Sequence, residues 1–231
     1  VWMVVAILAT ACDPNPYPEI SVDLAAARDD EPELADPRAT HVLRFSVAAM
    51  QSPRNTYAAY AHLFERVGRL LDVDVELVQR RTYREVNQLL EDGGLDAALL
   101  CTGGYLDLRG RDPAVVEVVA VPMVAGQLTY RSLIIVPAAS LAHGLDDLAG
   151  QRFAFTDELS LTGRTYPVSL LRQRQRDPVE FFSATVATRS HDRSIAAVEH
   201  EMVEGAAVDS LIYDYMLAHD PARAALTRVL Q

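Results

Sequence analysis

The chain has 231 residues, of which 50% are hydrophobic and 23% charged, which is enough apolar material for one large domain or for two lobes of about a hundred residues each. The net charge of −11 argues against a nucleic-acid partner, because binding to a duplex needs a basic face. It does not exclude a small anionic ligand, since such a ligand responds to nearby N–H groups and side chains more strongly than to distant carboxylates screened by salt.

The segment 1–12 starts with an apolar run without charge and ends in a cysteine, Cys12. The run is too short to span a bilayer as a helix. Small residues before a cysteine, after an apolar core, resemble the lipobox of bacterial lipoproteins, and the missing basic region implies that the chain starts inside its signal peptide. We therefore expect a partial signal peptide in residues 1–12 and lipid attachment at Cys12. The alternative is an ordinary buried helix or strand with an incidental cysteine.

Residues 13–40 have a different composition, with five prolines, many Asp and Glu residues and little periodicity. This composition is typical of an extended, acidic and solvated tether. A tether that follows a lipid anchor holds a soluble domain off a membrane surface, so the two predictions support each other. They place the globular part outside the cytoplasm, in a periplasm or at a cell surface.

The segment 41–129 alternates strands and helices. Strands are predicted at 42–47, 73–78 and 97–101, and helices at 53–71 and 83–90. The third strand is an unbroken apolar run, which is typical of a strand buried on both faces. This alternation implies a parallel sheet with right-handed crossovers, in which ligands bind beyond the carboxyl ends of the strands.

The pattern restarts after two further strands, at 115–124 and 133–136. The second set of elements comprises strands at 152–155, 181–186 and 206–209 and helices at 145–148, 166–176, 191–204 and 211–219. Two α/β halves joined near Tyr130 predict two lobes with a cleft between them. We assign 41–129 to lobe 1, 130–209 to lobe 2 and 210–231 to an incomplete return toward lobe 1.

The loop 156–164 follows a short strand and precedes a helix. Pro167 is tolerated only in a first helical turn, so the regular helix begins just before it, and the N–H groups from about Leu161 onward lack helical partners. These N–H groups, the helix dipole and the hydroxyls of Ser160 and Thr162 make the loop a candidate anion site. The alternative is a helix N-cap without a ligand.

Four further side chains are predicted to converge on the cleft. Tyr57 lies at the start of the first helix and Tyr105 follows a glycine pair after the third strand, and a phenol can donate a hydrogen bond to an anion. His191 opens a helix, and Asp209 ends a buried strand, where a carboxylate is costly unless it is paired. Asp209 is therefore expected to neutralise a ligand amine, to accept a ligand proton or to pair with His191. A core aromatic and a partly exposed histidine at a helix start are the structural alternatives.

Nucleophilic catalysis is the main rival interpretation, because Ser160 or Ser190, His191 and Asp209 supply the residue types of a hydrolase triad. However, no serine lies in a Gly-x-Ser-x-Gly elbow. The six histidines are scattered without metal-ligand spacing, and the sequence has no glycine-rich dinucleotide or phosphate loop. Cys101 ends an apolar run and is predicted to be a small buried hydrophobe. We expect no catalytic residues, no metal and no cofactor.

Four motifs resemble one known family, the phosphonate/phosphite/phosphate-binding proteins of ABC importers. The segment Thr156 to Gly163 (TDELSLTG) is similar to the family signature Thr-Asp-Pro-x-Ser-Thr-Ser-Gly. Ser190-His191-Asp192 with its helix, and the later Ala206-Ala207-Val208-Asp209-Ser210, resemble the family's Ser-His-Asp helix and Ala-x-Val-Asp-Ser strand. Tyr57 with Ala61, and Gly103-Gly104-Tyr105, resemble its first-helix tyrosine region and its Gly-Pro-x-x-Tyr loop. The likeness runs from about Leu43 to Tyr215.

The resemblance implies a two-lobed α/β fold of the periplasmic-binding-protein type 2, which closes on a ligand in the cleft. It also implies a ligand site made of Tyr57, Tyr105, Ser160, Leu161, Thr162, His191 and Asp209. In that site the loop hydroxyls and N–H groups hold phosphonyl oxygens, the phenols and the imidazole complete the cage, and the carboxylate holds a ligand amine or a phosphonyl proton.

The chain also departs from the family pattern. Leu161 replaces a Thr in the signature, Glu158 replaces its Pro, and Glu201 stands where the family usually has Gly. Members of the family continue well past the end of this chain. We therefore expect that the C-terminal part is truncated or that lobe 1 lacks an edge.

These predictions favour a membrane-anchored solute-binding lipoprotein that acts as a monomer, binds a small phosphorus oxyanion (phosphonate, phosphite or phosphate) and passes it to an ABC permease. Two alternatives stay open. One is an extracytoplasmic sensory domain of a signalling system on the same fold, and the other is a different oxyanion, such as a sulfonate. A fully ionised sulfonate offers no proton, so a carboxylate at Asp209 disfavours it.

Overall fold

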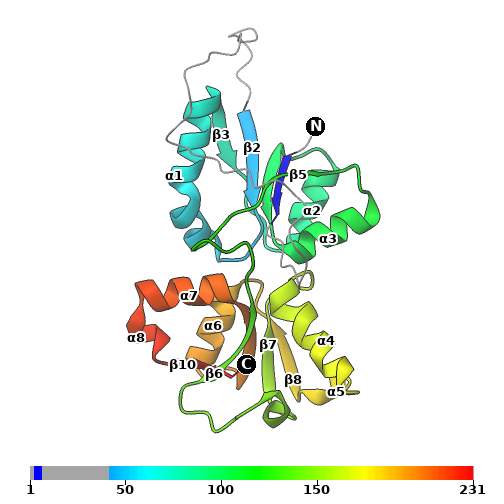
Figure 1. The fold of residues 1–231 in the computed structure, drawn as a ribbon, viewed down its shortest axis with the longest axis vertical. Coiled ribbons are helices and arrows are strands. Elements are labelled where there is room, and N and C mark those ends of the chain that lie inside the picture. The colour runs from blue at the N-terminus through cyan, green and yellow to red at the C-terminus, as the bar shows by residue number, and fades with distance from the viewer. Residues whose placement is uncertain (1–2, 7–41, 231) are drawn as a thin grey trace.

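Two lobes make up the part of the chain that the structure describes. The computed structural model describes residues 3–6 and 42–230. Each lobe contains a five-stranded sheet with helices packed against it, and the lobes are stacked along the long axis of the molecule (Figure 1). The α/β class and the two-lobed architecture predicted from the sequence are confirmed.

Lobe 1 is built on a parallel sheet with the strand order β3-β2-β4-β1-β5. Its strands are β1 (Met3–Ala6), β2 (Val42–Val47), β3 (Asp74–Leu77), β4 (Ala97–Leu100) and β5 (Glu117–Ala120). Its helices are α1 (Pro53–Leu71), α2 (Tyr83–Glu91) and α3 (Thr102–Arg111). β4 is buried at every residue, as expected for an apolar strand with a neighbour on each side. The core of the lobe forms around it.

The strand β1 lies inside the lobe 1 sheet, between β4 and β5, and pairs with both in parallel. Its residues belong to the segment for which the sequence predicts a signal peptide, and here they adopt the alternative form, a strand. The sequence Met-Val-Val-Ala suits this place, because β-branched residues favour strands and because β4 would otherwise carry unpaired N–H and C=O groups along one edge. Cys12 and the tether at 13–40 lie outside the described residues, so both stay predictions.

Lobe 2 contains a mixed sheet with the strand order β10-β6-β9-β7-β8. Its strands are β6 (Ser132–Pro137), β7 (Arg152–Phe155), β8 (Ala184–Ala187), β9 (Gly205–Asp209) and β10 (Thr227–Val229). Its helices are η1 (Leu145–Leu148), η2 (Leu161–Thr165), α4 (Tyr166–Gln173), α5 (Pro178–Phe181), α6 (His191–Glu199), α7 (Ser210–His219) and α8 (Pro221–Ala224). β7 pairs in parallel with β8 and β9, whereas β6 is antiparallel to β9 and β10. Packed phenylalanines, including Phe153 and Phe182 with ring centroids 4.4 Å apart, fill its core.

The segment 210–231, which the sequence analysis assigned to a return toward lobe 1, instead folds on lobe 2 in its described part. β10 pairs with the free edge of β6, and the Tyr213 hydroxyl lies 3.0 Å from the Thr227 hydroxyl. Pairing with β6 satisfies backbone groups that a bare sheet edge would expose. The local sequence of such a short strand does not show which distant strand it pairs with, so the pairing of β10 with β6 could not be predicted.

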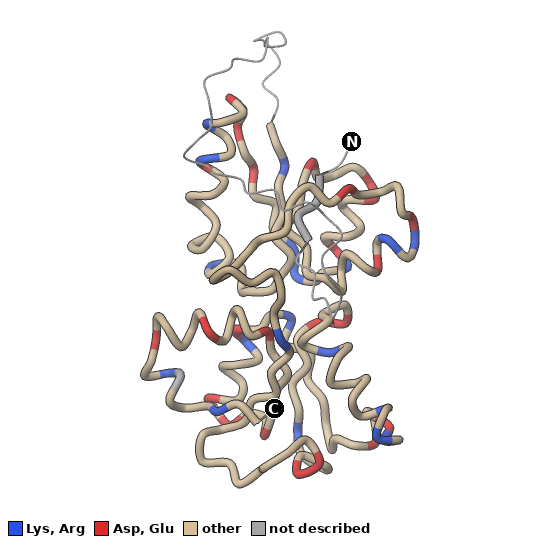
Figure 2. The backbone as a smooth tube through the Cα atoms, in the orientation of Figure 1, with Lys and Arg blue, Asp and Glu red and all other residues tan. Residues whose placement is uncertain are grey.

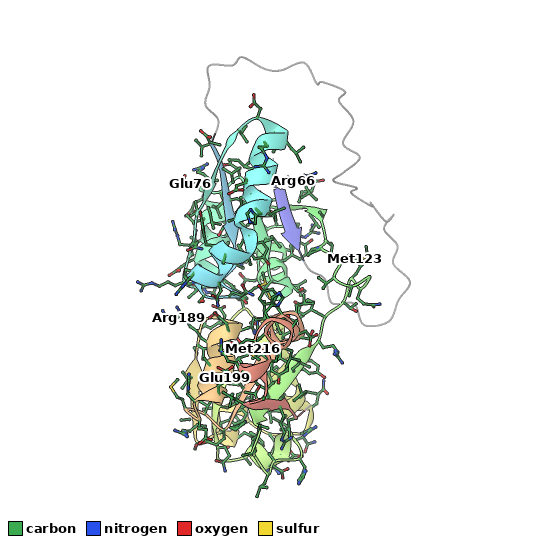
Figure 3. All side chains as sticks on the ribbon, turned by 90° about the vertical axis from the view of Figure 1, so that its left-hand side faces the viewer. Arg66, Glu76, Met123, Arg189, Glu199 and Met216 are labelled. Atoms are coloured by element: carbon green, nitrogen blue, oxygen red, sulfur yellow. The ribbon has the colours of Figure 1, made fainter. Side chains whose placement is uncertain are left out.

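Two residues beside α6 have a left-handed backbone although they are not glycines. Arg189 precedes the helix with φ 67°, and Glu201 follows it with φ 53°. Arg189 lies at the level where the two lobes meet (Figure 3), and its N–H donates to the carbonyl of Thr156 at 2.7 Å. The turn before α6 is therefore tied to the start of the loop after β7, at the lobe boundary.

The lobes are held together by carboxylates of lobe 2 at the helix starts of lobe 1. Asp157 accepts the N–H of Tyr83, the first residue of α2, at 3.3 Å. Asp192 accepts the N–H of Ser52, the N-cap of α1, at 2.9 Å and the amide of Asn55 at 2.8 Å. Both carboxylates lie where the helix dipole favours negative charge. The structure is therefore a closed form, with lobe-to-lobe hydrogen bonds already made.

Charged residues of both signs are interspersed over both lobes, and Figure 2 shows no continuous basic stretch along the described chain. This distribution of charge and the net charge of −11 do not provide the basic surface that nucleic-acid binding needs. Within residues 3–6 and 42–230, no helix has the length and apolar character to cross a membrane.

Candidate ligand site between the lobes

The loop after β7 has a rigid backbone. Ser160 is the N-cap of η2, and its hydroxyl accepts the N–H of Gly163 at 2.9 Å. The N–H of Thr165 donates to the Ser160 carbonyl at 3.0 Å. A Cβ at Gly163 would lie 2.5 Å from Thr156, so only glycine fits there. Ser160 and Thr162 are buried, at 0% and 3% exposure. The Ser160 hydroxyl thus acts as a cap.

His191 is a buried N–H donor with a fixed tautomer. It is the first residue of α6 and is 0% exposed. Its Nδ1 accepts the backbone N–H of Asp209 at 3.1 Å, and since that N–H can only donate, the hydrogen of the neutral ring lies on Nε2. Burial lowers the pKa of His191 to about 3, only partly opposed by the charge of Asp192, so the ring is neutral at pH 7. Nε2 has no hydrogen-bond partner among the described residues.

Asp209 is a buried carboxyl group with a raised pKa. It ends β9, caps α7 and accepts the N–H of Leu211 at 2.7 Å. Burial raises its pKa to about 7, although the N–H groups of Leu211 and Ile212 and the hydroxyl of Thr162 act in the opposite direction. The group can therefore accept a hydrogen bond when ionised and donate one when protonated.

Three tyrosines that the sequence analysis did not select as ligand residues lie close enough to this carboxyl group for its charge to affect their pKa. Tyr83 and Tyr130 are buried, and Tyr60 is partly buried. Burial and then the charge of Asp209 raise the pKa of Tyr60, and the same two causes contribute for Tyr83 and Tyr130. The hydroxyl of Tyr130 lies 2.9 Å from that of Thr102. The Tyr83 hydroxyl is buried without a partner in the described chain. A signal for Tyr83 existed, because it begins the helix that follows a parallel strand.

The two tyrosines that the sequence analysis selected differ in their burial. Tyr57 is 63% exposed, because the neighbouring positions Thr56 and Tyr60 of α1 face inward. Tyr105 packs against the lobe 1 core, with the Arg109 guanidinium 6.0 Å from its ring centre. Among the predicted site residues, the structure buries Ser160, Thr162, His191 and Asp209 between the lobes and leaves Tyr57 at the surface.

Glu158, which replaces the Pro of the family signature, has an exposed side chain. Its side chain is 70% exposed and forms an ion pair with Arg84 of lobe 1, with a distance of 3.8 Å. The pair crosses the cleft, so this substitution adds a weak contact between the lobes.

The geometry does not form a hydrolase triad. A triad needs the base to donate Nδ1–H to the carboxylate, whereas here Nδ1 of His191 accepts the backbone N–H of Asp209. The Ser160 hydroxyl is engaged with Gly163. No group of three or more His, Cys, Asp or Glu side chains in the described part of the chain is placed to hold a metal. What the site offers is hydrogen-bond donors around one protonatable carboxyl group.

Comparison with known proteins agrees with this chemistry. Residues 45–231 match the family model of the phosphonate periplasmic substrate-binding proteins of ABC transporters. The chain belongs to this family. The family comprises periplasmic substrate-binding proteins of ABC transporters for phosphonate.

Solved structures show the same fold at low sequence identity. The binding-protein component of an ABC phosphonate transporter from Pseudomonas aeruginosa is 19% identical with a TM-score of 0.74, and the match covers 82% of this chain and 64% of that one. PhnD1 from Prochlorococcus marinus, solved with methylphosphonate, is 18% identical with a TM-score of 0.71, covering 82% and 71%. The alkanesulfonate-binding protein of Xanthomonas axonopodis pv. citri, bound to MOPS, is 18% identical with a TM-score of 0.52, covering 82% and 60%. The chain thus spans less than two thirds of the Pseudomonas protein.

Proposed function

We propose that this family member binds a small phosphorus oxyanion (a phosphonate, phosphite or phosphate) in the cleft between its lobes and delivers it to an ABC permease. The observation that carries the proposal is the Nε2–H of His191, a fully buried donor that has no partner among residues 3–6 and 42–230. An unpaired buried donor costs about 1–3 kcal/mol, and a bound anion would remove that cost. The Tyr83 hydroxyl is a second such group.

Asp209 supports a phosphorus anion over a sulfonate. Its pKa of about 7 means that it carries a negative charge for part of the time at neutral pH. A phosphonate or phosphite monoanion still has a proton to donate to that carboxylate, and a dianion can accept one from the protonated form. A sulfonate has no proton, so it meets only repulsion from an ionised Asp209.

Several parts of the proposal come from the sequence alone. A lipid anchor at Cys12 and a tether at 13–40 would hold the lobes near the permease, outside the cytoplasm. A single copy supplies both walls of the cleft, which fits a monomer. In this scheme the anion contacts both lobes, so binding favours the closed arrangement.

Calorimetry of the purified chain with phosphite, phosphate, methylphosphonate, 2-aminoethylphosphonate and methanesulfonate tests the proposal. We expect saturable binding of at least one phosphorus anion and weaker binding of methanesulfonate. Binding of methanesulfonate alone, or of none of the five, would refute the proposed ligand class. Tyr57→Phe serves as a control variant with unchanged affinity, because this tyrosine is at the surface.

A further inference from the structure

Thr156 joins the loop 156–164 to the rest of lobe 2. It follows β7 directly and is fully buried. Its N–H donates to the carbonyl of Gly163 at 3.1 Å, and its carbonyl accepts the N–H of Arg189 at 2.7 Å. The backbone of Thr156 therefore connects the far end of the loop with the turn before α6. The sequence analysis assigned no role to its side chain.

The hydroxyl of Thr156 lies among polar groups of α6 and β9. Its Oγ1 is 3.1 Å from Nδ1 of His191 and 3.2 Å from the hydroxyl of Ser194, both on α6. The same hydroxyl lies 3.2 Å from the carbonyl of Ala207 on β9, to which it can donate. One buried hydroxyl thus links the first turn of α6 to the strand beside it, at the ring of His191.

Further hydroxyls hold the Thr156 side chain in place. The hydroxyl of Ser194 is 2.5 Å from that of Thr188. Thr188 in turn lies within hydrogen-bond distance of two carbonyls, that of Phe155 at 3.2 Å and that of Ser190 at 3.1 Å. Because each neighbour is itself hydrogen-bonded, the network fixes the orientation of the Thr156 hydroxyl.

Two contacts at Nδ1 fix the imidazole ring of His191. One is the N–H of Asp209 and the other is the hydroxyl of Thr156, each 3.1 Å away. The hydrogen-bond partner of one ring nitrogen decides which nitrogen carries the hydrogen, and here it leaves that hydrogen on Nε2. A rotation of the ring about χ2 would break both contacts. The Nε2–H group is therefore held in one direction.

The side chain of Thr156 also supports the loop itself. A Cβ built on Gly163 would lie 2.5 Å from both Cβ and Oγ1 of Thr156, so the loop backbone packs directly on this side chain. The same side chain therefore contacts the loop on one side and the ring of His191 on the other. It sets the position of the two groups of candidate anion donors relative to each other.

We propose that Thr156 is a positioning residue of the anion site, whose hydroxyl holds the ring of His191 so that Nε2–H meets an oxygen of an anion bound at the loop 156–164. The proposal rests on the proposed function, because it assumes a phosphorus oxyanion at that loop. Thr156 makes no contact with the anion in this arrangement and acts through His191. Its effect on affinity should therefore depend on the presence of the imidazole.

A double-mutant cycle tests this dependence by calorimetry, with the phosphorus anion that the unmodified protein binds most tightly. Thr156→Val removes the hydroxyl and keeps the shape of the side chain. We expect it to weaken binding by about fivefold or more in the original chain and by less than about twofold in His191→Ala. Thr156→Ser, which keeps a hydroxyl, should restore the original affinity to within about twofold.

A matched control removes a buried hydroxyl elsewhere in lobe 2. The hydroxyl of Thr227 lies 3.0 Å from that of Tyr213, and Thr227 is buried. Thr227→Val should lower the stability of the protein in urea, as Thr156→Val should, but it should leave the affinity for the anion unchanged. The comparison separates a general loss of stability from the loss of a positioned donor.

Nitrogen NMR of histidine-labelled protein tests the hold on the ring without any anion. The signals that vanish in His191→Ala identify this ring among the six histidines. We expect a single tautomer with the hydrogen on Nε2 in the original chain and in Thr156→Ser, and a mixed or exchange-broadened signal in Thr156→Val. An unchanged His191 signal in Thr156→Val, or an equal loss of affinity with and without His191, would overturn the proposal. The absence of heat with every anion in the unmodified protein would instead overturn the proposed function, and the NMR result would still decide whether Thr156 holds the ring.

Discussion

Replacing His191 by alanine separates its role in binding from its role in folding. The two ring nitrogens have different roles: Nδ1 accepts the Asp209 backbone N–H, whereas Nε2–H has no partner in the described chain and is available to a ligand. The Asp209 N–H loses its partner in both the empty and the bound protein, so that loss cancels in the affinity. Only the bond from Nε2–H to the anion differs between the two states. A hydrogen bond to a charged group contributes about 1.5–3 kcal/mol, or about 10- to 150-fold in Kd.

The variant His191→Ala should also lower the free energy of unfolding, and this loss can be worked out separately. It leaves the N–H of Asp209 buried without a partner, at a cost of about 1–3 kcal/mol, and it also creates a cavity, because His191 is fully buried. Denaturant unfolding should therefore show a loss of stability at least as large as the loss of binding energy. Calorimetry and unfolding on the same preparation measure both quantities.

The pH dependence of binding gives a sharp check on the reasoning. Because burial lowers the pKa of His191 to about 3, the ring is a neutral donor at every pH from about 5 upward. Affinity should consequently show no step at the ordinary histidine pKa near 6.5 that disappears in His191→Ala. A step of that kind, or an affinity of the variant within about twofold of the original, would refute the assignment of Nε2–H as an anion donor.

Three further predictions concern other groups. Folding raises the pKa of Asp209 from 3.8 to about 7, so its contribution to stability is full below pH 3.8 and is lost as the pH rises through 7. As the pH falls from 8 to 5, the melting temperature of the original protein should therefore rise relative to that of Asp209→Asn. A difference in melting temperature that does not depend on pH would contradict this. Glu201→Gly should stabilise the protein by about 1 kcal/mol in urea unfolding, because φ 53° strains any residue with a Cβ, and lower stability would contradict it. Tyr83→Phe should weaken anion binding by about 1–3 kcal/mol in calorimetry while Tyr57→Phe does not, and the reverse order would restore the sequence-based choice of Tyr57.

Local signals explain which site residues could be predicted. His191 and Asp209 each stand at a junction between a strand or turn and a helix, and the loop with Ser160 and Thr162 stands at a third, so a short window identifies them. Tyr83 could not be selected in this way, because its contact with the second lobe, from its N–H to Asp157, is a long-range one. Cys101 lies in the hydrophobic core of lobe 1, as its apolar run predicts.

Two other differences have the same physical origin. The helical period cannot separate Tyr57 from Tyr60, because residues three apart lie close on the same face, and only packing decides that Tyr60 is partly buried and Tyr57 exposed. An apolar run such as Met3–Ala6 satisfies the criteria for a signal peptide and for a central strand alike, and its pairing with β4 is a long-range contact. The fold class could be predicted from the alternation of strands and helices alone, and this alternation occurs in both lobes.

The carboxylates of Asp157 and Asp192 have a kinetic consequence. Their hydrogen bonds to the starts of α2 and α1 join protein groups alone, so they favour the closed arrangement of the lobes independently of a ligand. A ligand can then bind only after the lobes separate, so lobe opening limits the rate of association. The observed rate of binding should level off at high ligand concentration, at the frequency with which these two hydrogen-bonded contacts break. Such a protein releases its ligand slowly and also binds it slowly. In the proposed function, contact with the permease would have to separate the lobes before the ligand is released.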